Sequence, residues 1–120
     1  MALAHAQPLD VINVRPLATR LHQTKSHSLL KTDKLQLMRV VLVAGQAMPE
    51  HHVASEVTIQ CLEGQVRVST PERTCTLAAG DVMALPPQAS HALQAISDAS
   101  LLVTILLHQA PAQASQDPPG

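Results

Sequence analysis

The chain has 120 residues, enough for one domain, with a formal net charge of −1, 46% hydrophobic and 14% charged residues. It contains no Phe, Tyr or Trp, so it lacks the aromatic platforms on which single-stranded nucleic acids stack. The near-neutral charge also argues against nucleic acid and anionic membrane surfaces as partners. No apolar run approaches the roughly 20 residues of a membrane helix. With two cysteines only, we expect a cytoplasmic protein with reduced thiols.

The first 34 residues are predicted to form an extension with one or two strands. Residues 9–14 (LDVINV) end at Arg15-Pro16 and predict a short strand. Residues 17–27 fit either a turn or two of helix or irregular structure, and residues 26–30 favour a strand. The path of residues 15–30 therefore stays open at this point.

From residue 28 onward, short apolar segments alternate with turn residues. Turns are predicted at Asp33-Lys34, Glu63-Gly64, Pro71-Glu72, Gly80-Asp81 and Ser97-Asp98, and a loop is predicted over residues 45–55. The segments between them are rich in Val, Ile, Leu and Thr, and no helical period interrupts them. Short strands at this spacing predict an all-β sandwich or barrel. Residues 108–120 are rich in Pro, Ala and Gln and are predicted to be a disordered tail.

Two segments of this region share a pattern of glycine, proline and histidine. Gly45 precedes His51 in a segment that closes at Glu63-Gly64, and Gly80 precedes Pro86 and His91. In this order they resemble the two motifs of the small single-domain cupins. The resemblance covers residues 35–107 and implies an all-β cupin jelly-roll barrel, a double-stranded β-helix, with an N-terminal strand extension.

The resemblance also implies a divalent transition metal (Fe, Mn, Ni, Cu or Zn) held inside the barrel by histidines and a carboxylate. His51 and His91 match ligand positions directly. His52 stands one residue early, and a one-residue shift turns a side chain of a regular strand to the opposite face. His52 joins the other two only if residues 49–55 are looped or bulged, which Pro49 favours. On that basis we expect a three-histidine metal site made of His51, His52 and His91.

Two valines oppose this expectation. Counted back from Gly64, the cupin second-histidine and carboxylate positions fall on Val53 and Val57, and Glu56 also stands one residue early. Two functions therefore stay open. One is a metal-dependent enzyme of oxygenase or isomerase type, and the other is a non-enzymatic barrel that binds or senses a small molecule with a degenerate metal site or none.

Strand alternation predicts the pocket walls, and the amount of apolar surface predicts the oligomeric state. The predicted pocket walls are Val57, Ile59, Val66, Met83, Leu85 and Leu93, which suit a small apolar or amphiphilic organic ligand. Residues 35–43 become apolar on both faces, and residues 101–107 add a further apolar run. Because this is more apolar surface than one small barrel hides, we expect a homodimer.

Overall fold

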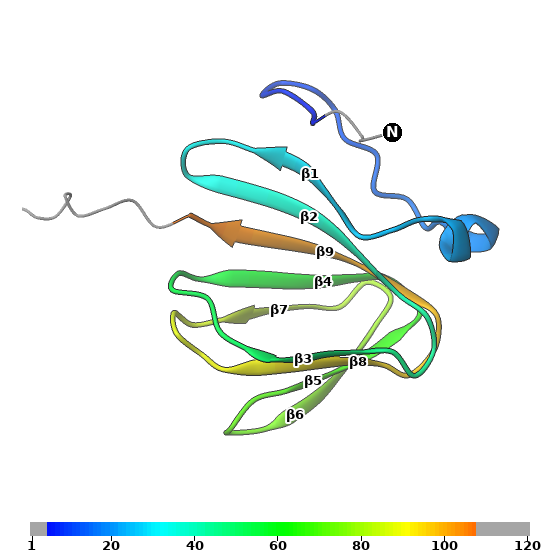
Figure 1. Cartoon of the computed structure of the whole chain (residues 1–120), viewed down its shortest axis with the longest axis vertical. Helices are drawn as coiled ribbons and strands as arrows, with labels where there is room; N and C mark the ends of the chain where they lie inside the picture. The colour runs from blue at the N-terminus through cyan, green and yellow to red at the C-terminus, as the bar shows by residue number, and fades with distance from the viewer. Residues whose placement is uncertain (1–4, 108–120) are drawn as a thin grey trace, which may run out of the picture.

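The computed structural model describes residues 5–107, which form nine strands and one short 3-10 helix, η1 Ala18–Gln23 (Figure 1). The strands are β1 His27–Lys31, β2 Leu35–Leu42, β3 Ala47–His51, β4 Val57–Glu63, β5 Gln65–Ser69, β6 Thr74–Ala78, β7 Val82–Leu85, β8 His91–Ala95 and β9 Ala99–Leu106. The predicted tail lies outside the described residues. Within residues 5–107, no helix has the length and hydrophobicity needed to cross a membrane.

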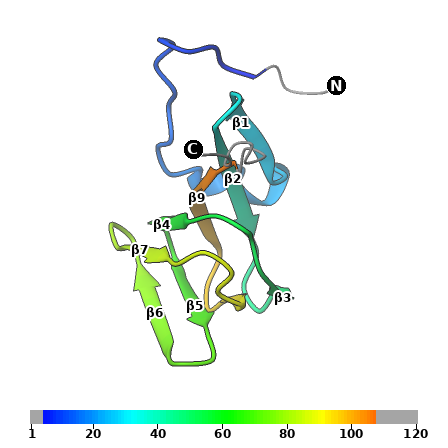
Figure 2. The same ribbon diagram turned by 90° about the vertical axis from the view of Figure 1, so that its left-hand side faces the viewer.

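The strands form two antiparallel sheets that face each other (Figures 1 and 2). One sheet has the order β1-β2-β9-β4-β7, and the other has the order β3-β8-β5-β6. Strands that are distant in sequence therefore lie side by side, as β2 does with β9 and β3 with β8. The all-β prediction is confirmed.

The core between the sheets consists of aliphatic side chains that alternate inward along each strand. In β4, Val57, Ile59 and Cys61 are buried, and the residues between them are partly exposed. Val66 and Val68 of β5 reach the same core from the opposite sheet. Burying these side chains supplies the main favourable term in folding, and no aromatic residue is needed to fill the space.

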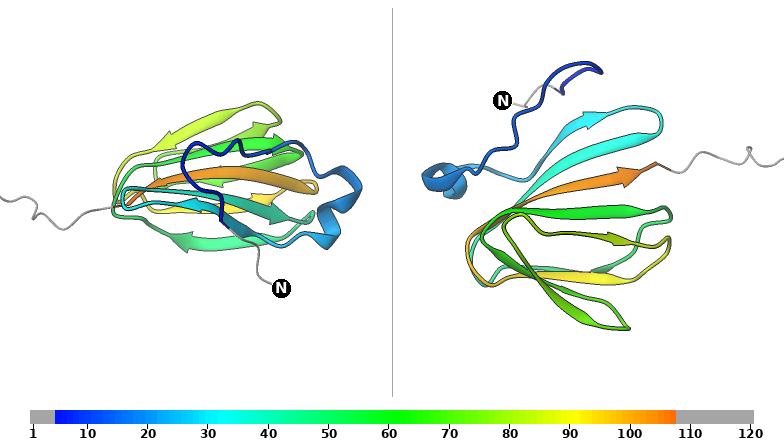
Figure 3. Two further views of the ribbon diagram at one scale, coloured as in Figure 1. Left: turned by 90° about the horizontal axis from the view of Figure 1, so that it is seen from above. Right: turned by 180° about the vertical axis from the view of Figure 1, so that it is seen from behind.

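The N-terminal region differs from the prediction. Residues 5–17, called the arm below, contain no strand, so the strand predicted over residues 9–14 is wrong. Leu9 has a φ of 81°, a left-handed conformation that does not continue a strand. The arm runs across the outer side of the five-stranded sheet (Figure 3). η1 follows it, and Leu17 and Leu21 pack against Val41 of β2 in a small second core.

Candidate functional site

His51 and His91 are brought together by the pairing of β3 with β8. They are Cα partners in this antiparallel pair, and their ring centroids lie 4.3 Å apart with the ring planes inclined at 57°. His91 is buried, with 4% of its surface exposed, whereas His51 is exposed. The pair therefore links the interior of the barrel to the solvent.

The local structure of β3 explains why His51 lies opposite His91. The register of the β3–β8 pair shifts between Met48 and His51, across Pro49, which has no backbone N–H to donate. The predicted loop over residues 45–55 thus contains a short irregular strand. The strand ends at His51, and His52 follows it as an exposed residue.

Hydrogen bonds define which ring nitrogen of each histidine carries the proton. Nδ1 of His51 lies 3.0 Å from the carbonyl oxygen of Pro49, and Nδ1 of His91 lies 3.1 Å from that of Ala89. A carbonyl oxygen only accepts, so each Nδ1 donates, and each neutral ring keeps a lone pair on Nε2. Within residues 5–107, neither Nε2 has a hydrogen-bond partner.

The protonation of His91 follows from its surroundings. Burial lowers the pKa of His91 from its ordinary value of 6.5, and the neighbouring His51 lowers it further, while the hydrogen bond to Ala89 acts in the opposite direction. The net shift is downward. His91 is therefore a neutral imidazole with an accepting Nε2 at neutral pH.

Both histidines line a cavity of about 100 Å³ inside the barrel, called the barrel cavity below. Its other walls are the aliphatic and methionine side chains Met38, Val40, Met48, Val53, Val57, Ile59, Leu93, Val103 and Ile105. Two polar groups thus meet an otherwise apolar space. Such a space has the chemical character of a small-molecule site.

The structure places three of the six predicted lining residues at the barrel cavity and the other three elsewhere in or against the core. Val57, Ile59 and Leu93 line the barrel cavity. Val66 and Leu85 are buried in the core, and Met83 packs against it, but none of the three lines the barrel cavity. The alternation of residues along a strand predicts which side chains point into the barrel, but it does not predict how far along the barrel axis each side chain lies. The walls from β2 and β9 were missed, although the two-faced apolar pattern of residues 35–43 was a signal for them.

The sequence of residues 38–107 matches the family model for the cupin domain. This chain belongs to the cupin family. A search of curated proteins found no match. The match to the family model confirms the predicted resemblance. The matched residues include the strands that carry both histidines.

Solved structures agree on the cupin fold. A cupin superfamily protein from Desulfitobacterium hafniense superposes with a TM-score of 0.72 at 19% identity, covering 88% of this chain and 100% of that one. A conserved protein of unknown function from Streptococcus pyogenes gives a TM-score of 0.72 at 20% identity, with coverages of 92% and 100%. An RmlC-like cupin with a double-stranded β-helix from Methanocaldococcus jannaschii gives 0.65 at 20% identity, with coverages of 76% and 84%.

The residues present in this cupin do not fit a tightly held resident metal. Val53 and Val57 line the barrel cavity beside the two histidines, whereas His52 and Glu56 are exposed. In the part of the chain that the structure describes, no group of three His, Cys, Asp or Glu side chains is placed to hold a metal ion. The predicted three-histidine set is therefore not assembled. Two imidazoles remain, fewer than the three protein ligands of a typical catalytic zinc site.

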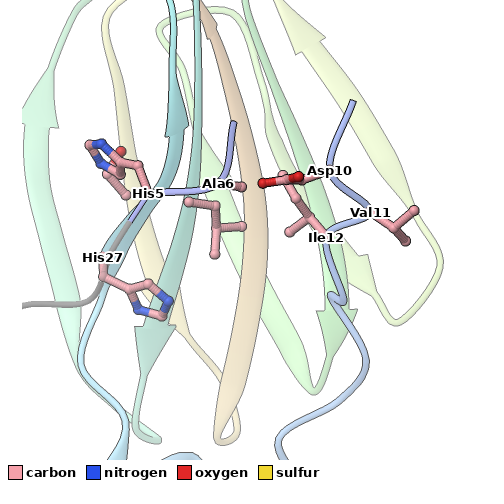
Figure 4. Close-up of a pocket in the computed structure, with 8 residues that line it drawn as sticks. His5, Ala6, Asp10, Val11, Ile12 and His27 are labelled. Atoms are coloured by element: carbon pink, nitrogen blue, oxygen red, sulfur yellow. The ribbon is translucent and has the colours of Figure 1, made fainter. Parts of the chain in front are cut away.

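A larger hollow, of about 460 Å³, lies between the arm and β1 of this cupin (Figure 4). In Figure 4, His5 and His27 lie toward one end of it, and Asp10 and Val11 toward the other. These polar groups form no metal-binding group of three among residues 5–107. The barrel cavity, and not this hollow, holds the two histidines at motif positions.

A polar cluster that the sequence did not predict lies on the outer side of the five-stranded sheet. Arg39 is buried, with 4% exposed, and its Nη2 donates to Ser100 Oγ at 3.1 Å and lies 3.6 Å from a carboxylate oxygen of Glu63. Glu63 also accepts hydrogen bonds from the backbone N–H groups of Leu17 and Ala18, at 2.8 and 3.0 Å. The sequence feature that could have predicted this cluster is the arginine inside the apolar segment 35–43.

Proposed function

We propose that this cupin binds a small, largely apolar molecule that carries a hydrogen-bond donor, and that it does so without a tightly held resident metal. The observation that supports the proposal is the pair of accepting Nε2 atoms, from His51 and His91, on an otherwise apolar barrel cavity. Neither Nε2 atom has a hydrogen-bond partner within residues 5–107. A ligand hydroxyl or amine would donate to one of them.

Size and protonation narrow the ligand class. A cavity of about 100 Å³ accepts a molecule of only a few heavy atoms, or the end of a longer one. The lowered pKa of His91 keeps that ring an acceptor at neutral pH, so a donor is favoured and a bare cation or anion is not. Short alcohols and amines have this chemistry.

A second candidate function is a metal centre built on the same two imidazoles, in an enzyme of oxygenase or isomerase type. It is favoured by the Nδ1–H contacts to the carbonyls of Pro49 and Ala89, because metal-binding histidines commonly donate their other ring N–H in this way. A bound metal would supply Lewis acidity at open coordination positions. His51 and His91 would hold it.

One experiment on the tag-free full chain separates the two candidates. Ligand binding is measured by NMR titration with ethanol, 1-propanol and 1-butanol, and metal binding by calorimetry with Fe, Mn, Ni, Cu and Zn salts. We expect saturable alcohol shifts at β3 and β8 that disappear in His91→Leu and persist in the exposed control His52→Gln. The proposal is contradicted if none of the three alcohols gives saturable shifts. Stoichiometric metal binding that is lost in His91→Leu favours the metal centre.

We also propose that the cupin forms a homodimer. Leu9 and Val11 of the arm are fully exposed, at 102% and 99%, and Val82 and Leu106 at the surface of the five-stranded sheet are exposed at 60% and 44%. Exposed apolar groups of this kind favour association with a second copy. Light scattering coupled to gel filtration tests this, and a monomer at micromolar concentration contradicts it.

A further inference from the structure

A further pocket, of about 330 Å³, lies between the arm, η1 and the outer side of the five-stranded sheet, and is called the arginine pocket below. Its polar lining comes from Asn13, Arg15, Arg20, Thr24, His27 and Arg39. Arg39 belongs to β2, and Val40, the next residue, lines the barrel cavity from the other face of that strand. The arginine pocket is therefore separate from the barrel cavity.

The charge of the arginine pocket is positive. Three of its lining residues are arginines, and none is acidic. Glu63 neutralises part of this charge, since its carboxylate lies 3.6 Å from Arg39. The pKa of Arg39 is lowered, mainly by burial and also by repulsion from Arg20, while the charge of Glu63 raises it. One carboxylate near three guanidinium groups leaves an excess of positive charge.

Arg39 also has a hydrogen-bond donor that lacks a partner among the described residues. Its Nη2 donates to the carbonyl oxygen of Arg15 and to Ser100 Oγ. Its Nε is buried and has no hydrogen-bond partner among residues 5–107. A buried charged donor without an acceptor is unfavourable, so a ligand oxygen that reached it would gain a strong charge-assisted hydrogen bond.

We propose that the arginine pocket binds a small organic anion through a phosphate or carboxylate group. Planar guanidinium groups match the oxygens of both groups, and Arg20, whose side chain has no hydrogen bond within the described residues, is free to close over the ligand. Thr24 and Asn13 add neutral polar groups at the edge. The absence of aromatic residues removes the stacking that a nucleic-acid strand would use.

The test uses the full chain and two probes, inorganic phosphate and malonate, in separate NMR titrations at constant ionic strength. Constant ionic strength keeps general charge screening equal in all samples. We expect saturable shifts of amides around Arg20, Thr24 and His27. Binding by phosphate alone identifies a phosphate-bearing ligand, and binding by malonate alone identifies a carboxylate.

Two variants carry the same change of charge. Arg20→Gln is expected to weaken anion binding about tenfold, because it removes one charge-assisted contact. Arg73→Gln is the matched control, since Arg73 is exposed in the turn between β5 and β6, outside the arginine pocket. The proposal is overturned if neither anion gives saturable shifts, or if Arg20→Gln binds as tightly as the wild type. Equal weakening in Arg73→Gln would also overturn it.

Discussion

His91 faces His51 across the β3–β8 pair with ring centroids 4.3 Å apart, and only His91 is buried. Two identical side chains thus occupy different environments at one site. The asymmetry follows from position, because β8 lies between β3 and β5 whereas β3 is the edge strand of its sheet. Its consequences are measurable in the pH dependence of stability.

Acidification is expected to destabilise the fold through His91. Because its pKa is lowered in the folded protein, the unfolded chain binds a proton more readily around the ordinary value of 6.5. The stabilisation by neutral His91 is therefore present above that value and is lost as the pH falls through the folded pKa. Urea unfolding of wild type and His91→Gln at about pH 7.5 and about pH 5 checks this. The wild type is expected to lose more stability on acidification, and equal losses would contradict the prediction.

Substituting a third imidazole at Val53 is expected to create a metal site. Val53 lines the barrel cavity together with His51 and His91, at the position where the cupin motif has a histidine. Zinc binding by Val53→His, measured by calorimetry, should be at least about tenfold tighter than that of the wild type. Ala54→His is the matched control, because Ala54 is exposed and does not line the cavity. Similar affinities for the two variants would show that the site does not accept a third ligand.

Removing the carboxylate of Glu63 is expected to release the arm. Glu63→Gln leaves Arg39 without its charged partner and weakens the hydrogen bonds to Leu17 and Ala18. We expect a loss of about 2–3 kcal/mol in the free energy of unfolding, and faster hydrogen exchange at those two amides. Glu72→Gln, an exposed control, should change stability by less than about 0.5 kcal/mol. Unchanged exchange at Leu17 and Ala18 would contradict the prediction.

The same carboxylate has its own pH signature. Burial raises the pKa of Glu63, but hydrogen bonds from Leu17, Ser100 and Ala18 and the charge of Arg39 outweigh burial, so the pKa lies below the ordinary 4.5. Its stabilisation is therefore present above pH 4.5 and is lost as the pH falls through the folded pKa. Protection of the Leu17 and Ala18 amides, measured relative to their intrinsic exchange rates, should fall in that window in the wild type and stay constant in Glu63→Gln.

Two glycines are expected to differ in their tolerance of alanine. Gly64 and Gly45 both have a positive φ, of 78° and 85°. A Cβ on Gly64 would also collide with the backbone of Asp98 and Ala99, whereas a Cβ on Gly45 would meet nothing within 4 Å. We expect Gly45→Ala to cost about 1 kcal/mol of unfolding free energy and Gly64→Ala more than about 3. Similar urea midpoints for the two variants would show that the contact with Asp98 and Ala99 is not limiting.

The barrel was predictable because the residue patterns that determine it lie within single strands and short motifs. Strand parity correctly placed Val57 and Ile59 inside, and the motif spacing placed His51 and His91 at one site. Short-range patterns of this kind determine which face of a strand is buried. The same spacing placed Val53 at a ligand position, and Val53 lines the barrel cavity, whereas His52, which we expected to join the site, is exposed and does not line it.

The arm was not predictable because long-range contacts position it. Leu17 and Ala18 are held by Glu63, which lies 46 and 45 residues further along the chain. The local pattern of residues 9–14 favours a strand, but no neighbouring strand pairs with it among the described residues. A strand without a partner leaves its backbone groups unpaired. Buried Arg39 was unexpected for a similar reason, since its partners Ser100 and Glu63 come from two other strands.

The contact between Glu63 and the arm also implies an order of folding. Glu63 ends β4, and Ser100, which donates to it, lies in β9, so the acceptor site for Leu17 and Ala18 exists only once these two strands have paired. Closing such a long loop before the barrel forms would cost conformational entropy with little return. We therefore expect residues 5–23 to attach to the barrel after β4 and β9 have paired, although these residues are synthesised first.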